Sequence, residues 1–429
     1  MNIPLIIFVV FFALIFILRI PIALGMITNA IIYMVLTSRD IGLVMEAVSS
    51  NLFTKWIIIA VPLFIFTANV MNAGKITDLL FGFANGLVGK WRGGMGHVNV
   101  VASLIFSGMT GSAVADASGL GLMEIEAMRR YGYDKGFSCA ITAASATIGP
   151  VFPPSIPMVF YALLSGTSIG ALFLGGMIPG FLLAILLMGY IAIVAKRRNY
   201  PRGEQVTARQ FWKTTFKSVP ALITPVILLG GIYTGVMTPT EAGAVAGLYS
   251  VVVAALVYRA MGWKSLWSVI VMTVVRTGAV SIIVGAAFAS SYVVAVENIP
   301  DMIASAMLGL TENKYVLLLI INILFLIMGM FIDTSTITVV FVPMVLPLVT
   351  TLGIDLVHFG VVVVLNMMIG LSTPPFGVLL FIVSGISDTP LQQVIKAILP
   401  MILVMIGLLF LLSYVPEIIL FLPRALGML

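Results

Sequence analysis

Apolar runs of about 20 residues, the length of a membrane-spanning helix, recur along this chain. They restrict the possible folds of the chain more than any other feature. Hydrophobic residues make up 61% of its 429 residues and charged residues only 9%. A soluble domain carries about 25% charged residues, so too few are present here to cover a water-facing surface. Long alternating apolar and polar segments are missing, which favours helices over a barrel. The sequence predicts an all-α polytopic membrane protein.

The apolar runs set the expected spans, and at about 20 residues each the chain has room for on the order of twelve crossings. The first run lacks a basic segment before it and a cleavage site after it, so we expect a retained span. A single cysteine, Cys139, and two distant histidines indicate neither a disulfide nor a metal cluster. Spans or part-spans are expected at residues 1–19, 20–37, 54–72, 137–165, 169–195, 219–237, 240–259, 277–296, 356–388 and 396–422.

Basic residues indicate how the chain is oriented in the membrane. Residues 196–217 are rich in lysine and arginine, which marks a cytoplasmic segment. Two spans later a second basic stretch, 259–276, which includes Arg276, returns to the same side. One more span leads to an acidic segment, 297–312, on the outer side. Because the positive charge is concentrated in this way, the net charge of +6 does not indicate nucleic-acid binding.

Two apolar stretches contain proline and glycine where a spanning helix should be unbroken. They are IGPVFPPSI at 148–156 and IGLSTPPFG at 369–377, and their Ile-Gly and Pro-Pro pairs match at one offset of 221 residues. The same offset relates Gly108-Met109 to Gly329-Met330, and Pro179 to Pro400. These matches indicate a duplication. An odd number of expected crossings separates the copies, so the repeats should be inverted, as in many secondary transporters.

A segment that is apolar at both ends and polar in the middle precedes each break. The segments are 95–128 and 315–350, with the centres SGMTGSAVADASG and GMFIDTSTIT. This pattern predicts a re-entrant hairpin, which is tolerated where protein or a water-filled cavity surrounds its turn. The predicted divisions are scaffold helices at 1–75, a first transport repeat at 76–195, scaffold helices at 196–276, and a second repeat with a final span at 277–429.

Two amphipathic stretches are expected to lie in the headgroup layer of the membrane rather than to cross it. They are EQVTARQFWKTTFKS at 204–218 and YRAMGWKSLWSVI at 258–270, where aromatic and basic residues recur at helical spacing. Their interpretation ranges from simple anchors in contact with membrane lipid to arms that hold a moving domain against a fixed one.

A broken helix leaves backbone carbonyls free for a cation, and the start of its second half presents a positive dipole end to an anion. Hydroxyl groups are available at both breaks and both hairpin centres. The alternative is a kink in a packed helix, but two symmetric breaks, each with a polar hairpin, favour a binding site. The hydroxyl and carboxyl residues concerned are Thr110, Ser112, Thr147, Ser155, Asp333, Thr334, Ser335, Thr336, Ser372 and Thr373.

Asp333 is the most informative acidic residue, because an ionisable group in the membrane interior is functional by default. It could bind a cation, carry a proton, contact a substrate hydroxyl or ammonium group, or cap the second helix of its hairpin. Asp116 is a weaker candidate that could pair with a nearby arginine at a membrane surface. The group Glu124, Glu126, Arg129 and Arg130 is expected at a solvated helix end.

A membrane hydrolase is the rival class, and the sequence supports it poorly. An intramembrane serine protease needs a base beside its serine, and the histidines lie in unsuitable contexts around SGTS at 165–168. An aspartyl protease would have to pair Asp116 with Asp333, without supporting motifs around them.

The residues from Ser107 to Ala162, SGMTGSAVADASGLGLMEIEAMRRYGYDKGFSCAITAASATIGPVFPPSIPMVFYA, resemble the large membrane subunit of TRAP transporters (tripartite ATP-independent periplasmic transporters). IGLSTPPFGVLLF resembles that subunit too, and the likeness covers essentially the whole chain. The chain differs from the family pattern at Thr110, where serine is common, and at Glu124 and Glu126, which are usually apolar. The second difference concerns the packing of that helix.

The resemblance implies a sodium-driven importer of an organic acid in the bacterial inner membrane, without an organic cofactor. It implies two partners, a small four-helix membrane subunit and a periplasmic substrate-binding protein, and an elevator motion of the repeats against a scaffold. The whole chain looks most similar to sialic-acid systems. A C4-dicarboxylate or sugar acid is the alternative substrate, and coupling to protons instead of sodium is the alternative mechanism.

By position, the resemblance also implies three groups of site residues. One sodium ion would be bound by Ser103, Ser107, Gly149, Phe152 and Pro154. A second would be bound by Gly329, Asp333, Thr334, Gly370 and Thr373. The substrate would contact Ser112, Ser155, Ser168 and Asp333.

Overall fold

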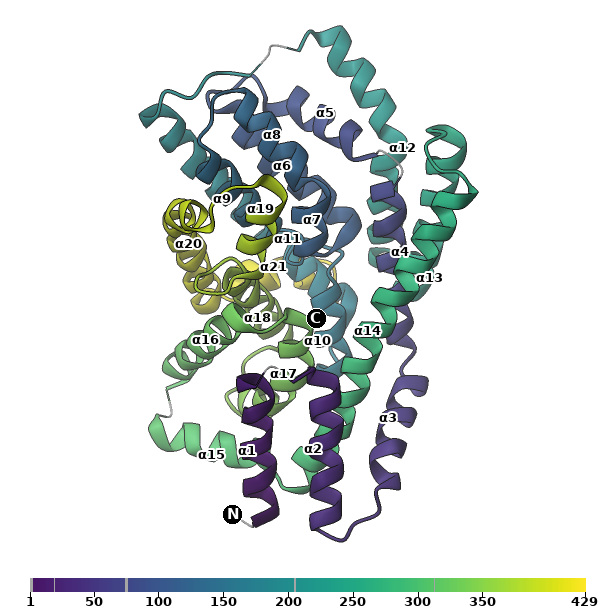
Figure 1. Cartoon of the computed structure of the whole chain (residues 1–429), viewed down its shortest axis with the longest axis vertical. Helices are drawn as coiled ribbons and strands as arrows, with labels where there is room; N and C mark the ends of the chain where they lie inside the picture. Colours follow the sequence, from purple (N-terminus) through teal and green to yellow (C-terminus); the bar gives the residue numbers. More distant parts are fainter. Residues whose placement is uncertain (1–2, 19, 74–75, 204–205, 312) are drawn as a thin grey trace.

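The computed structural model describes residues 3–18, 20–73, 76–203, 206–311 and 313–429, which are largely helical (Figure 1). Within these ranges the β-structure is an isolated bridge between Arg92 and Arg202. Eight of the described helices are long and apolar enough to cross a membrane. The prediction of an all-α polytopic membrane protein is confirmed. The ends of the first predicted span, at residues 1, 2 and 19, and the end of the acidic segment, at 312, lie outside the described residues.

The α-helices follow one another along the chain as α1 (Ile3–Ile17), α2 (Ile22–Leu36), α3 (Gly42–Thr54), α4 (Ala60–Ala73), α5 (Ile76–Val88), α6 (Gly94–Thr110), α7 (Ala113–Gly119), α8 (Gly121–Arg130), α9 (Lys135–Ala146), α10 (Ile156–Ser165), α11 (Ile169–Arg197), α12 (Ala208–Tyr233), α13 (Pro239–Val252), α14 (Trp263–Val296), α15 (Ile299–Leu310), α16 (Lys314–Phe331), α17 (Thr334–Thr351), α18 (Leu356–Leu371), α19 (Val378–Ser387), α20 (Leu391–Tyr414) and α21 (Glu417–Ala425). A short 3₁₀ turn, Trp56–Ile59, precedes α4, and a π turn, Val253–Val257, follows α13.

Both predicted breaks occur at the prolines. The first separates α9 from α10 and the second separates α18 from α19. Proline has no N–H to donate and clashes with the preceding turn, so neither helix can continue through its Pro-Pro pair. The Pro153-Pro154 and Pro374-Pro375 bonds are both cis. Helix α10 starts again with Ser155 as its N-cap, and the hydroxyl oxygen accepts a hydrogen bond from the Met158 N–H at 3.2 Å.

Both predicted hairpins are present, and each turns at a capping residue. In the first, α6 ends at Gly111, whose φ of +59° places it in the left-handed region that glycine tolerates. Ser112 then caps α7, and its hydroxyl accepts the Ala115 N–H at 3.4 Å. In the second, Asp333 is the N-cap of α17 and accepts the Ser335 N–H at 2.9 Å. The predicted capping role of Asp333 is confirmed.

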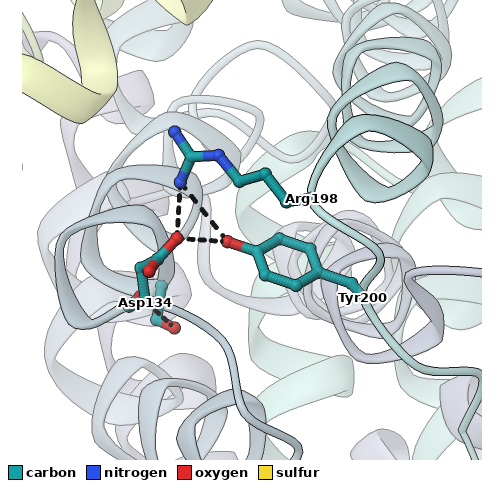
Figure 2. A network of polar contacts seen from close by, with 4 residues as sticks. Asp134, Arg198 and Tyr200 are labelled. Atoms are coloured by element: carbon teal, nitrogen blue, oxygen red, sulfur yellow. Dashed lines mark hydrogen bonds and ion pairs between the residues drawn. The ribbon is translucent and has the colours of Figure 1, made fainter.

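The first hairpin begins and ends on the face that carries the basic segment after α11. The Gly93 N–H, just before α6, donates to the Pro201 carbonyl at 3.1 Å. At the far end of the hairpin, Figure 2 shows Arg198 and Tyr200 both pointing toward the Asp134 carboxylate, at 2.5 and 2.6 Å. The Tyr200 hydroxyl and then the Arg198 guanidinium hold the pKa of Asp134 below its usual value. This hairpin therefore returns to the face from which it starts.

The second hairpin starts from the opposite face. Helix α20 begins beside α9, where Gly136 packs against the backbone of Gln393. It runs to the other face, where the Tyr414 hydroxyl donates to the Tyr315 carbonyl in the first turn of α16, at 3.3 Å. In Figure 1, α6 and α8 lie above and α16 and α17 below. The two repeats are therefore inverted.

The repeats also pack against each other reciprocally. The hairpin helix α7 contacts α19 of the second broken helix, and the hairpin helix α17 contacts α10 of the first. In the same way α9 contacts α20 and α11 contacts α18. These matched contacts interlock the two repeats as one unit. Helices α4, α12, α13 and α14 lie to one side of it (Figure 1).

The predicted interfacial stretches are not separate helices. Residues 208–218 form the first turns of the longer helix α12, and residues 263–270 form those of α14, whereas residues 204 and 205 lie outside the described residues. Trp212 and Trp263 are exposed on these first turns. The predicted boundary between the scaffold helices at 196–276 and the second repeat at 277–429 falls inside α14, which continues unbroken across it. The larger division into scaffold and transport parts stays a prediction.

Three further helices were not expected from the sequence, namely α3, α5 and α15. Each has 13 or fewer residues, too few to span a membrane, so a search for spans passes over them. The last predicted span is shorter than expected, because α20 ends at Tyr414 and Pro416 separates it from α21.

Candidate functional site

A cavity of about 400 Å³ lies where the hairpin turns and the broken helices meet. The repeats form one wall of it and the helices α4 and α14 form the other. On the repeat side it is lined by Thr110, Gly111, Ser112, Ala113, Val114, Ala115, Pro150, Ile156, Pro157, Asp333, Thr334, Ser335, Met368 and Leu371. On the other side it is lined by Ile65, Ala68, Asn69, Arg276, Ala279 and Val280. Segments about half the chain apart are thus brought to one site.

The first hairpin turn is held against the first break by backbone contacts. The Ile156 N–H donates to the Gly111 carbonyl at 3.4 Å. A Cβ at Gly111 would lie 2.5 Å from the Pro154 oxygen, so only glycine permits this approach. A Cβ at Gly149 would lie 3.5 Å from the Ser112 carbonyl carbon. These contacts place Ser112 at the cavity beside the broken helix.

The first predicted sodium site contains oxygen atoms that are not fully engaged. Among the described residues, the carbonyls of Gly149, Phe152 and Pro154 accept no hydrogen bond. Unpaired carbonyls at membrane depth are costly unless something binds them. The Ser107 hydroxyl donates to the Leu104 carbonyl at 2.5 Å, and Ser103 lies 3.2 Å from the Ser145 hydroxyl. Carbonyl and hydroxyl oxygens are suitable ligands for a small hard cation.

The second predicted sodium site is built on a close helix crossing. Gly329 and Gly370 let α16 and α18 approach, since a Cβ at Gly370 would lie 2.7 Å from the Gly329 Cα. The Thr373 hydroxyl donates to the Ile369 carbonyl at 2.6 Å, and the Thr373 N–H donates to the Gly370 carbonyl at 2.9 Å. Asp333 accepts its capping hydrogen bond through Oδ2 and is exposed toward the cavity. Its second oxygen is therefore available to a ligand.

The structure separates the four residues predicted to contact substrate into two pairs. Ser112 and Asp333 line the cavity. Ser155 is fully buried, and its hydroxyl donates to the Pro150 carbonyl while accepting the Met158 N–H, so it stabilises the break. Ser168 caps α11 by accepting the Ala171 N–H at 3.3 Å. It follows the far end of α10, about 15 Å along that helix from the cavity.

Comparison with known proteins shows which family has this arrangement. The family described as "Tripartite ATP-independent periplasmic transporter, DctM component" matches residues 8–418 of the chain. The chain belongs to this family. It is a multi-pass protein of the inner membrane.

Two relatives of this DctM-family chain are similar over most of their length but are named for different cargo. The sialic acid TRAP transporter large permease protein SiaM of Vibrio cholerae is 40% identical over 405 residues, 94% of this chain and 95% of the relative. The C4-dicarboxylate TRAP transporter large permease protein DctM of Pseudomonas aeruginosa is 38% identical over 371 residues, 86% of this chain and 87% of the relative. Both are named as transporter permeases, which points away from a membrane hydrolase.

A solved structure shares the fold. The Alcanivorax borkumensis YdaH transporter, described as having an unusual topology, aligns with a TM-score of 0.63 over 87% of this chain and 88% of that one. The sequences are 15% identical, so this likeness concerns the fold alone.

Two acidic residues of the DctM-family chain do not lie where the sequence suggested. Glu124 was expected at a solvated helix end, but it is 1% exposed, and Oε2 accepts the Asn99 side-chain amide at 2.9 Å. Asp116 was expected to pair with an arginine near the surface. It is also 1% exposed, and in the part of the chain that the structure describes it forms no ion pair. The packing of α6, α8 and α9 buries the helix face that carries Glu124.

Glu126 and Arg130 are exposed as predicted and lie 3.8 Å apart as an ion pair, whereas Arg129 is half-buried and donates to the Ser387 carbonyl at 3.4 Å. Asp116 does not line the cavity that contains Asp333, so the two carboxylates do not form an aspartyl dyad there.

Arg276 is a candidate site residue that sequence reasoning missed. It was counted with the cytoplasmic basic stretch, but α14 begins at Trp263 and carries Arg276 about 20 Å along the helix, at about 1.5 Å per residue. Its guanidinium donates to the Asn69 side-chain oxygen at 3.1 Å and borders the cavity. An arginine within a membrane helix is costly, by about 2.5–3.5 kcal/mol at the helix centre on insertion scales, so Arg276 is a candidate functional group. The apolar run VIVMTVV immediately before Arg276 was the feature of the sequence that could have placed this residue within a membrane helix.

Proposed function

We propose that this chain is the large membrane subunit of an importer that couples the entry of an organic acid to sodium. The observation that carries the proposal is that both hairpin turns and residues at both breaks line one cavity, opposite α4 and α14. Family membership supports the transport class. The predicted ion sites support the ion, because the first break offers unpaired carbonyls and the second hairpin turn offers the Asp333 carboxylate.

Sodium is a transported ion in this proposal. At the first break it would be bound by the free carbonyls of Gly149, Phe152 and Pro154 together with Ser103 and Ser107. At the second it would be bound by Asp333, Thr334 and Thr373, with Gly329 and Gly370 keeping α16 and α18 in contact. Each ion would join a hairpin turn to its break, so that the walls of the substrate cavity form only when the ions are present. Sodium would therefore bind before the organic acid, and this order would couple the transport of the acid to that of sodium.

The position of the cavity supports an elevator mechanism. One wall belongs to the interlocked repeats and the other to α4 and α14, so a movement of the repeats along these helices would carry the cavity across the membrane. Hairpins that enter from opposite faces would then close it on one side at a time. A small membrane subunit is the proposed neighbour of the scaffold, and a periplasmic binding protein is the proposed donor of substrate.

Sialic acid is the first substrate to test, because SiaM of Vibrio cholerae is 40% identical. A C4-dicarboxylate is second, because DctM of Pseudomonas aeruginosa is 38% identical. The difference is too small to choose between them, and a sugar acid remains the third class.

The experiment is uptake of labelled sialic acid, succinate and gluconate into liposomes that contain the large and small subunits, with the cognate binding protein outside. We expect one acid to accumulate chemically unchanged at a rate at least tenfold above liposomes without protein. Hydrolysis of the substrate, or no accumulation of any of these acids, would contradict the proposed function.

A further inference from the structure

Few groups in the cavity could bind the negatively charged carboxylate of an organic acid. Among its described lining residues, Arg276 and Asp333 carry the charged side chains, one of each sign. A carboxylate needs a cationic partner or several N–H donors to replace its water shell. Asp333 is an acid and would repel it. The remaining choices are Arg276 and the N-termini of the helices that start at the cavity.

Each helix that starts at the cavity already has a side-chain cap: Ser112 caps α7, Ser155 caps α10 and Asp333 caps α17. In the first turn of α10, the Ile156 N–H donates to the Gly111 carbonyl, and the N–H groups of Met158 and Val159 donate to Ser155. Pro157 has no N–H at all. The start of α17 is capped by the carboxylate of Asp333. The predicted positive dipole end of α10 stays a prediction, but its first N–H groups are not free to bind an anion directly.

Arg276, by contrast, has N–H groups that are free to donate to a ligand. A guanidinium carries five N–H groups, and one hydrogen bond from it is described, to Asn69 Oδ1 at 3.1 Å. No acidic side chain in the described ranges forms an ion pair with it. The Asn69 side-chain amide donates to the Thr273 hydroxyl at 3.0 Å, and that hydroxyl donates to the Val269 carbonyl at 2.8 Å. This chain of hydrogen bonds turns the Asn69 oxygen toward Arg276 and orients the guanidinium.

Arg276 also lies between two cavities. Arg276 and Asn69 border both the site cavity and a second cavity of about 370 Å³. The second cavity is lined by hydroxyl groups, including Ser118, Ser265 and Ser268, and follows α14 toward its first residue, on the side that the basic segments assign to the cytoplasm. An anion that leaves the site toward the cytoplasm would pass this guanidinium.

We propose that Arg276, oriented by Asn69, binds the carboxylate of the transported acid from the α4–α14 wall, at the junction between the site cavity and the cytoplasmic-side cavity. This inference rests on the proposed function. It divides recognition of the acid between the two walls: Ser112 and Asp333 of the repeats contact its uncharged polar groups, and Arg276 holds its charge. In an elevator, a contact from the non-moving wall would be made in only one of the two end states.

The test compares Arg276→Gln with Arg276→Lys, and with Lys264→Gln as a matched control. Lys264→Gln removes a positive charge from the same helix at an exposed position outside both cavities. Each variant complex of large and small subunit is measured for uptake of the acid that the wild type imports, with binding protein present. Equilibrium binding of that acid is measured without binding protein. Thermal unfolding reports whether each variant is folded.

We expect Arg276→Gln to lower kcat/KM and to weaken binding by about tenfold or more, as removal of a charge-assisted pair with a carboxylate should. Arg276→Lys should keep part of the activity, because it keeps the charge but not the planar fork. Lys264→Gln should stay within about twofold of the wild type. If Arg276→Gln does not fold, a folded Arg276→Lys with a raised dissociation constant supports the proposal.

Folded Arg276→Gln or Arg276→Lys protein that binds and imports the acid like the wild type would overturn the inference and leave the proposed function standing. A wild-type complex that imports none of the tested acids would instead contradict the proposed function.

Discussion

Replacement of Asp333 with asparagine is expected to lower uptake of the organic acid about 100-fold or more, although the protein should remain folded. Asparagine is as good an N-cap as aspartate, so the hydrogen bond from the Ser335 N–H should persist and α17 should still begin at Thr334. What disappears is the negative charge that faces the cavity. Loss of one partner from a charged binding pair costs about 2–5 kcal/mol, which corresponds to this loss of uptake.

Asp355 supplies a matched control for that experiment. It caps α18 by accepting the N–H groups of Val357 and His358 at 2.8 and 3.1 Å, and it does not line the cavity. Asp355→Asn should therefore take up substrate within about twofold of the wild type, since asparagine caps a helix as well as aspartate does. Uptake by Asp333→Asn equal to that of Asp355→Asn would show that Asp333 serves only as a helix cap.

The second large effect is expected from Gly370→Ala. The new Cβ would lie 2.7 Å from the Gly329 Cα, 2.8 Å from the Gly329 carbonyl carbon and 2.9 Å from the Leu326 oxygen. All three are backbone atoms of α16, which cannot rotate away as a side chain could. The helices would have to separate, at a cost of about 1–3 kcal/mol or more. Because α16 leads directly into the turn that carries Asp333, uptake should fall as well.

The measurements for Gly370→Ala are the thermal unfolding midpoint of the purified complex and the rate of uptake in liposomes. Gly407→Ala is the control, because a Cβ at Gly407 on α20 meets nothing within 4 Å. An exposed helical Gly→Ala change stabilises by up to about 1 kcal/mol, so this variant should unfold at the same or a slightly higher temperature. An unchanged midpoint and unchanged uptake in Gly370→Ala would mean that the α16–α18 crossing is looser than described.

The breaks and hairpins could be predicted because their causes are local. Proline removes a backbone donor wherever it occurs, so the ends of α9 and α18 follow from residues 148–156 and 369–377. The repeated offset then relates the two halves without knowledge of packing. Asp333 could be identified in the same way, as a lone acid within an apolar hairpin. These features need only the chain near each residue.

What could not be predicted depends on contacts between distant segments. Glu124 reads as the start of a charged helix end, and only its packing against Asn99 and α9 buries it. Arg276 shares a basic stretch with residues at the membrane surface, and only the continuity of α14 places it at the cavity. Ser155 and Ser112 look equivalent in sequence, yet one holds the break and the other lines the cavity. Such differences arise from tertiary structure.

In the proposed transporter, the two hairpin turns and the two breaks form one site where sodium and an organic acid are bound together. The most direct test is uptake of the imported acid at fixed pH, with the complete transporter in liposomes, when external sodium is replaced by potassium. We expect uptake to fall to the level of protein-free liposomes and to return when sodium is restored. Full uptake in potassium alone would contradict the claim and would favour a proton or no coupling ion in its place.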